Sequence, residues 1–179
     1  ITAMLELLMK LPLAEDAAFQ TVRELNRLFP YGDNDGAALG IAMEDKISGK
    51  LTCSMDMVRT EGEYISAVMD IRYPVLFSLE PAFTLMKTAM PDCEVVNLHS
   101  RPPHFVSEDT PLVKELLEAY HEVTGFEKKT IAIGGGTYAQ SMEEGVAFGA
   151  QFPGEVEMAH QADEFLTLHS MFESTRIIA

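Results

Sequence analysis

The sequence predicts an α+β fold for its first part and an α/β fold for the rest. Along residues 63–73, apolar residues alternate with mostly polar ones, which is typical of a strand with one packed face. After about residue 104, helical patterns alternate with short apolar runs, which is typical of buried parallel strands. We therefore predict two domains, residues 1–103 with an antiparallel sheet and helices on one side, and residues 104–179 with α/β order.

The composition is that of a soluble globular protein, with 179 residues, 47% hydrophobic and 23% charged. Thirteen basic and 28 acidic residues give a net charge of −15, which repels phosphate backbones and anionic membranes. The sequence has no signal peptide and no apolar run of about 18 residues. We predict a cytoplasmic protein, a monomer, with neither nucleic acid nor membrane as a partner. Because the chain begins at Ile1 inside a helical pattern, we expect a fragment.

Cys53 and Cys93 are far apart and form no C-x-x-C motif. The sequence predicts two buried free thiols in a reducing compartment.

The first domain opens with two predicted helices, at residues 1–11 and 15–28. A polar turn at residues 31–36 leads to three predicted strands in an antiparallel meander, at residues 37–44, 50–60 and 63–73. A helix over residues 77–90, with Ser78 near its cap, and a strand over residues 93–99 complete it. The adjacent prolines Pro102 and Pro103 mark the predicted domain boundary.

The second domain begins with a helix that starts at Thr110-Pro111 and stops at Gly125. Two strands are predicted, at residues 128–133 and 145–150, and a final helix at residues 163–178.

Three consecutive glycines, Gly134, Gly135 and Gly136, follow the first of these strands. Glycines let the backbone turn sharply and let its N–H groups approach a ligand. If Thr137 or Tyr138 opens a helix, the segment offers a site for an anion, carboxylate or phosphate.

Other interpretations of the glycines compete. The run fits a dinucleotide fingerprint, but only about six residues separate Tyr138 from the next predicted strand, too few for the crossover helix of a nucleotide-binding unit. A P-loop is excluded because no Lys-Ser/Thr follows. A turn made only for close packing stays open.

His160 ends the loop after the second predicted strand, with Asp163 and Glu164 following. A lone histidine is more often structural than a ligand, and zinc needs three or four protein ligands. The sequence has no H-E-x-x-H, no H-x-D and no cysteine pair, so any co-ligands of His160 lie outside it.

Arg72 lies on the polar face of the third predicted strand, before Tyr73-Pro74. It either forms an ordinary salt bridge with a neighbour such as Asp70 or holds a carboxylate with its guanidinium fork.

Several motifs occur in a familiar order along the chain: LGIAMEDKISGKLT, DIRYP, PPHFV, TPLVKELLEAYHEVTG, IGGGTYA, GVAFGAQFPG and MAHQADEF. In this order they resemble the C-terminal part of the dinuclear zinc exopeptidases, in the dipeptidase V (Xaa-His dipeptidase, carnosinase-like) branch. In that family a lid domain interrupts a two-zinc catalytic domain, and a dipeptide substrate is held between the two.

The resemblance implies that residues 1–103 are the second half of the lid and residues 104–179 the closing segment of the catalytic domain. It implies that His160 is a zinc ligand, that Gly134 to Gly136 line the substrate site and that Arg72 binds the terminal carboxylate of the substrate. The family's other zinc ligands and its catalytic residues have no counterpart in this sequence. The implied function is zinc-dependent dipeptide hydrolysis by the full-length protein, with the fragment alone inactive. The alternatives are a non-catalytic lid or interaction module and a nucleotide-binding α/β domain.

Overall fold

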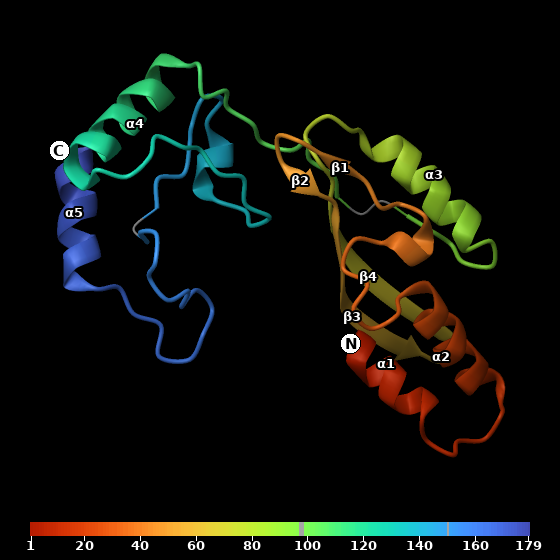
Figure 1. Cartoon of the computed structure of the whole chain (residues 1–179). Coiled ribbons are helices and arrows are strands. Elements are labelled where there is room, and N and C mark those ends of the chain that lie inside the picture. The colour runs from red at the N-terminus through yellow and green to blue at the C-terminus, as the bar shows by residue number, and fades with distance from the viewer. Residues whose placement is uncertain (97–98, 150) are drawn as a thin grey trace. The chain divides into compact units, whose positions relative to one another are not determined.

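The computed structural model describes residues 1–96, 99–149 and 151–179. The chain divides into two compact units, Ile1–Pro103 and His104–Ala179. In its described residues, the first unit contains α-helices, one short 3-10 helix and two small antiparallel sheets (Figure 1). This is an α+β arrangement, as the sequence predicts for this part. In order its elements are α1 (Thr2–Met9), α2 (Ala17–Leu28), η1 (Ala37–Leu39), β1 (Glu44–Asp45), β2 (Gly49–Lys50), β3 (Thr52–Glu61), β4 (Tyr64–Arg72) and α3 (Leu79–Ala89).

The helices of the first unit begin at the residues that their caps favour. Asp16 caps α2, and its side chain accepts a hydrogen bond from the backbone N–H of Phe19 at 2.9 Å. Ser78 is the N-cap residue of α3, as predicted. The helices pack against the hairpin of β3 and β4, and the buried core includes Leu5 from α1, Leu28 from α2 and Met86 from α3.

The hairpin of β3 and β4 carries a β-bulge that changes which side chains face the core. Met55 pairs with Met69, but the next pair is Met57 with Val68, so Asp56 is the extra residue. Before the bulge, Cys53 and Met55 are buried; after it, Val58 packs against the core, while Met57 is 39% exposed. The bulge therefore keeps an apolar side chain on the inner face along the strand.

The cysteines differ from the prediction. Both are free, as expected, but only Cys53 is buried, and Cys93 is exposed. Burial raises the pKa of the Cys53 thiol to about 11, with additional contributions from the nearby carboxylates of Asp33, Asp56 and Asp70.

The predicted strand over residues 37–44 is wrong for most of its length. Ala37–Leu39 forms the 3-10 helix η1 between Gly36 and Gly40, which have φ angles of 71° and 73° in the left-handed region. A side chain at Gly36 would also lie 2.4 Å from Cγ1 of Ile41, inside the core. The carboxylate of Asp33 accepts hydrogen bonds from the N–H groups of Ala37 at 3.1 Å and Ala38 at 2.7 Å. These local bonds replace the ladder of a strand, so the part of the unit that the structure describes has two separate two-stranded sheets in place of the predicted meander.

Asp45 joins the hairpin of β1 and β2 to the segment before α3. One carboxylate oxygen accepts from the N–H of Ser48 at 2.6 Å and of Ile47 at 2.9 Å. The other accepts from the N–H of Leu76 at 2.9 Å, across 31 positions of sequence. The pKa of Asp45 lies below its ordinary value, mainly because of the N–H of Ser48.

Acid is expected to weaken the first unit through Asp45 and Asp33. Burial raises the pKa of Asp33, but the N–H groups of Ala38, Ala37 and Asp35 lower it by more, so its net shift is also downward. A carboxylate whose folded pKa is depressed stabilises the fold above its unfolded pKa, near 3.9, and this stabilisation disappears as the pH falls through the folded pKa.

The measurement is thermal unfolding of the wild type, Asp45→Asn and Asp33→Asn at pH 6 and at pH 2.5. Each variant should melt a few degrees below the wild type at pH 6, and the difference should shrink at pH 2.5, below the ordinary pKa of a carboxyl group, because the unfolded chain then binds protons that the folded carboxylates resist. Asp92→Asn, at an exposed position with no hydrogen bond in the described part of the chain, is the control. A gap that widens on acidification would contradict this linkage.

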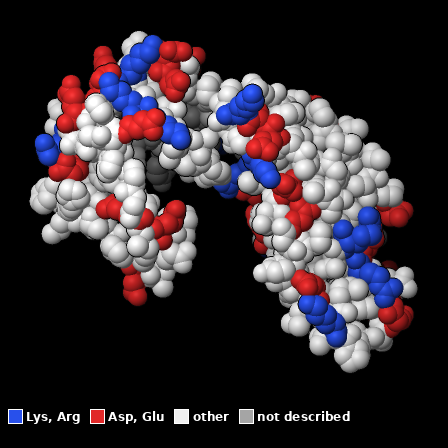
Figure 2. Space-filling view, viewed as in Figure 1, with Lys and Arg blue, Asp and Glu red and all other residues white. Residues whose placement is uncertain are grey.

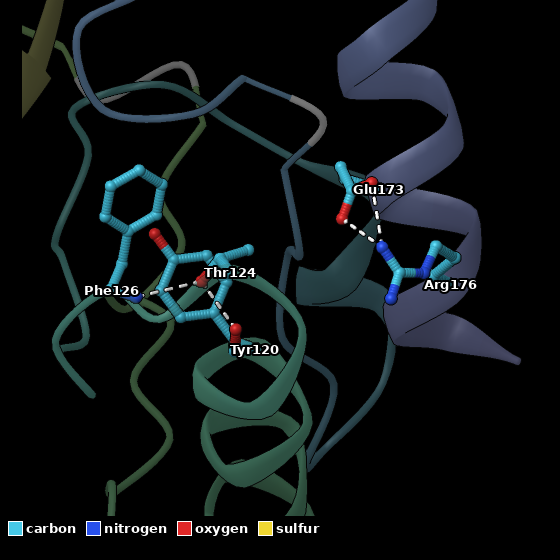
Figure 3. Close-up of polar contacts among 5 residues, drawn as sticks. All are labelled: Tyr120, Thr124, Phe126, Glu173 and Arg176. Atoms are coloured by element: carbon cyan, nitrogen blue, oxygen red, sulfur yellow. Dashed lines mark hydrogen bonds and ion pairs between the residues drawn. The ribbon is translucent and has the colours of Figure 1, made fainter.

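The second unit contains α4 (Pro111–Thr124), η2 (Tyr138–Ser141) and α5 (Leu168–Ile178). Helix α4 confirms its predicted limits, with Thr110 at the N-cap and Gly125 at the C-cap with φ 73°. The Thr124 hydroxyl donates to the carbonyl of Tyr120 at 2.6 Å and accepts from the N–H of Phe126 at 3.1 Å (Figure 3). These bonds satisfy backbone groups where the helix ends.

The Tyr120 ring organises the small core of the second unit. It stacks on Phe152, with centroids 6.3 Å apart and planes at 4°, and meets the edge of Phe148 at 81°. On α5, Arg176 forms an ion pair with Glu173 at 2.9 Å (Figure 3). The fully buried Ser170 donates to the carboxylate of Glu155, which connects α5 to the preceding loop.

Neither predicted strand of the second unit is formed. Residues 128–133 and 145–149 have no strand partner in the described part of the unit, and Ala150 lies outside the described residues. A strand requires a neighbour to take up its hydrogen bonds, so an apolar run without one remains irregular. Ile131 is 80% exposed and Ile133 58% exposed as a result. The visible face of this unit has wide areas without charged side chains (Figure 2).

Residues 93–99 and the final helix also differ from the prediction. The predicted strand over residues 93–99 has no strand at Cys93 to Val96, and residues 97 and 98 lie outside the described residues. The final helix starts at Leu168 rather than at Asp163, because Thr167 caps it by accepting from the N–H of Ser170 at 3.0 Å. In the described ranges, no helix combines the length and the apolarity that crossing a bilayer requires.

Candidate functional site

Arg72 is the last residue of β4 and lies opposite Thr52 of β3. Its guanidinium forms an ion pair with Asp70, two residues earlier on the same face of the strand, at 2.7 Å. Both side chains are partly solvent-exposed, 48% for Arg72 and 40% for Asp70. The hydrogen bonds that Arg72 donates to Asp70 raise the pKa of Arg72, so the guanidinium is a permanent positive charge on the outer face of the hairpin.

The salt bridge considered from the sequence is therefore present, and it uses only part of the guanidinium. Asp70 binds only one edge of the guanidinium, through Nε and Nη2. An arginine with a free edge is suited to a planar anion such as a carboxylate.

The three glycines are exposed and lead into η2, a 3-10 helix of four residues. The helix expected after them is thus a single turn, and it cannot supply the aligned dipoles of a helical anion site. None of the three glycines has a positive φ. A Cβ at Gly134 would meet no atom within 4 Å, and at Gly135 it would only touch the Ile133 side chain at 3.9 Å. Neither backbone conformation nor close packing within the described residues explains glycine at these two positions.

The first residue of η2 is equally uncovered. Tyr138, which opens η2, is 96% exposed. The glycines and this aromatic ring form a continuous accessible segment that a ligand can approach from solvent.

His160 is exposed in the loop before α5, in a left-handed backbone conformation with φ 61°. Asp163, three residues later, has φ 59°. Such conformations cost about 1–2 kcal/mol for residues other than glycine. They are found most often at active sites and ligand-binding loops.

The donor chemistry of His160 suits one position in a zinc site, because a neutral imidazole is a common zinc ligand. Across the described ranges, no group of three or more His, Cys, Asp or Glu side chains lies close enough to hold a metal ion. His160 also makes no hydrogen bond to the glycine segment there. His160 can therefore supply one ligand of a zinc site. The described residues do not form a complete zinc site.

One polar network escaped the sequence interpretation. The Glu155 carboxylate accepts from the N–H of Phe152 at 2.8 Å and from the hydroxyls of Thr167 and Ser170. The pKa of Glu155 is lowered, mainly by the bond from Phe152. The spacing of Thr167 and Ser170 was the available signal, since threonine three residues before serine is compatible with a helix cap. These hydrogen bonds join the two ends of the loop that contains His160.

The sequence pattern of the Peptidase family M20/M25/M40 matches residues 4–179. The chain is 38% identical over 166 residues to "Putative dipeptidase YtjP" of Bacillus subtilis (strain 168), covering 92% of this chain and 35% of the relative. It is 31% identical over 166 residues to "Putative dipeptidase SH1171" of Staphylococcus haemolyticus (strain JCSC1435), covering 88% of this chain and 35% of the relative. The chain thus spans about a third of the length of these relatives. Because the family pattern runs through both units, the chain belongs to the peptidase family M20/M25/M40.

Proposed function

We propose that this chain is the C-terminal part of a zinc-dependent dipeptidase that hydrolyses the amide bond of unblocked dipeptides. The observation that carries the proposal is the family match over residues 4–179, which includes Arg72, the glycines and His160. The relatives named as dipeptidases support the substrate class. Residues 1–103 would be the second half of a lid domain, and residues 104–179 the closing segment of the catalytic domain.

Each candidate residue has one task in this proposal. Arg72 binds the substrate's terminal carboxylate through the guanidinium edge that Asp70 leaves free. Gly134 and Gly135 let the substrate lie against the backbone, since a Cβ there would project into open space where the substrate binds. His160 supplies one imidazole ligand to zinc. Zinc, when bound, activates a water molecule and polarises the scissile carbonyl.

Dipeptide turnover tests the proposed function. The full-length protein that contains residues 1–179 should hydrolyse unblocked dipeptides, lose activity to a chelator and regain it with added zinc. The chain of residues 1–179 alone should hold no stoichiometric zinc and show no turnover, because it offers one of the several ligands that a zinc site needs. A metal-loaded full-length protein without dipeptidase activity would favour a non-catalytic module. Chelator-sensitive activity from residues 1–179 alone would contradict the division of ligands proposed here.

Gly134→Ala separates a ligand-binding role of the glycines from a structural one. A Cβ at Gly134 meets nothing within 4 Å, so the melting temperature should stay within about a degree. We expect kcat/KM of the full-length protein to fall roughly tenfold because the methyl group blocks the approach of the substrate.

Gly145→Ala is the matched control in the same unit. Its Cβ would lie 2.7 Å from the carbonyl oxygen of Ala139 and 2.8 Å from Cβ of Met142, so this variant should lower the melting temperature. If Gly134→Ala loses stability as Gly145→Ala does, the glycines serve the fold rather than the substrate.

A further inference from the structure

The guanidinium of Arg72 is held by one edge only. Nε donates to Oδ2 of Asp70 at 3.1 Å, and Nη2 donates to the same oxygen at 2.7 Å. Both bonds use the edge of the planar group that runs from Nε to Nη2. Oδ2 thus fixes the plane and the direction of the guanidinium, because two donors that converge on one acceptor restrict rotation about the last side-chain bonds.

The opposite edge of the group remains available. Arginine has five N–H donors, and one on Nη1 together with the second on Nη2 lies along the end edge, which Asp70 does not touch. In the described part of the chain, Nη1 has no hydrogen-bond partner. Two parallel N–H bonds along this edge match the spacing of the two oxygens of a carboxylate.

The hairpin supplies a rigid base for this arrangement. Asp70 and Arg72 are two positions apart on β4 and so project from the same face, opposite Ser54 and Thr52 of β3. Asp56, whose charge also acts on Arg72, accepts from the hydroxyl of Ser54 at 2.6 Å. Among the described residues, the hydrogen bonds of the guanidinium all go to Asp70.

Protein stability does not account for the pair. Both side chains are exposed, 48% and 40%, and ion pairs this exposed contribute little to folding. A substitution at Asp70 should therefore leave the fold intact, and its effect on a substrate can be measured separately.

We infer that Asp70 is a positioning residue, which holds Arg72 by its Nε–Nη2 edge so that the Nη1–Nη2 edge faces the terminal carboxylate of a dipeptide. This inference rests on the proposed function and deepens it, because it assigns a residue and a geometry to recognition of the carboxylate. Asp70 also carries a negative charge, which would repel a bound carboxylate. The positioning role requires that the ordering of the arginine outweighs this repulsion, and the two effects predict opposite changes in KM.

The first arm of the test uses residues 1–179 alone and does not depend on enzymatic activity. The Nε–H of Arg72 should exchange with water more slowly, by NMR, than that of Arg59. Arg59 lies on the same face of the hairpin, opposite Ser66, and makes no hydrogen bond in the described residues. Asp70→Ala should abolish the difference. Equal exchange rates in the wild type would overturn the inference, because Asp70 would not then hold the guanidinium in solution.

The second arm uses the full-length protein and unblocked dipeptides. Asp70→Ala should raise KM about fivefold with kcat changed less than twofold, because the arginine must be ordered when the substrate binds. Asp70→Asn should have a smaller effect, since its amide oxygen still accepts a hydrogen bond from the guanidinium. Neither variant should change the hydrolysis of a dipeptide with an amidated C-terminus. In the Arg72→Lys background, Asp70→Ala should add nothing.

Glu24→Ala is the matched control. Glu24 binds Arg27 through the same two kinds of nitrogen, Nε at 2.9 Å and Nη2 at 2.5 Å, in a pair on α2 that is somewhat more exposed. Its loss should leave KM unchanged.

Three outcomes of the kinetic arm overturn the inference. A KM that falls in both Asp70 variants would show that Asp70 competes with the substrate. If KM stays constant in the Asp70 variants while Arg72→Lys raises it, then Arg72 binds the carboxylate without help from Asp70. If Arg72→Lys itself leaves KM unchanged in an active dipeptidase, the carboxylate site lies elsewhere, and Asp70 has no part in it. An inactive full-length protein would instead contradict the proposed function, and the NMR arm would still decide whether Asp70 orients Arg72.

Discussion

Replacing His160 with alanine is expected to lower the dipeptidase activity of the full-length protein at least about a hundredfold, with the zinc content falling in parallel. The physical reason is the loss of one imidazole from a site in which each ligand contributes to both affinity and geometry. The measurements are kcat/KM for an unblocked dipeptide and the zinc content of the purified protein.

The left-handed backbone at His160 calls for a second variant. Alanine at φ 61° is strained, and a local change of the loop could lower activity by itself. Asparagine tolerates this conformation and is a poor zinc ligand, so His160→Asn should lose as much activity as His160→Ala. His169→Ala, at an exposed position of α5, is the control and should retain near wild-type turnover. Wild-type activity and metal content in both His160 variants would make His160 a structural residue.

Arg72→Lys is expected to reduce kcat/KM for unblocked dipeptides by about one to two orders of magnitude, with unchanged melting temperature and zinc content. Lysine keeps the positive charge but presents a single ammonium group, so the two parallel bonds to a carboxylate are lost. The fold should persist because the ion pair with Asp70 is exposed.

A C-terminally amidated dipeptide makes this experiment selective. The amide carries no negative charge for the guanidinium to bind, so the substitution should hardly change its already slow hydrolysis. A uniform loss on both substrates would mean that Arg72 supports the structure of the hairpin rather than recognition of the substrate.

The elements that depend on local patterns were predictable. The Thr110-Pro111 start and the Gly125 stop defined α4, and alternation along residues 63–73 defined β4. The resemblance of the motifs to the zinc exopeptidases was likewise sufficient to identify the family.

The elements that depend on distant partners were not predictable. Residues 128–133 have the composition of a strand, but a strand also needs a neighbour, and sequence composition does not report one. The stretch from Ala37 to Leu39 was misassigned because hydrogen bonds from the backbone to the Asp33 carboxylate compete with strand pairing. The pattern of apolar residues does not indicate these bonds. The edge by which Asp70 binds Arg72 needed side-chain geometry, although the sequence had indicated the pair itself.

Cys53 is buried and Cys93 is exposed, so the labelling of Cys53 can report transient opening of the first unit. A thiol reagent can reach Cys93 in the folded protein, whereas Cys53 is buried on the inner face of β3, and its pKa is raised. Once Cys93 is blocked, further modification requires that the core around Cys53 becomes exposed to solvent. The rate of this second labelling step therefore measures the population of open molecules under native conditions, without denaturant and without an introduced probe.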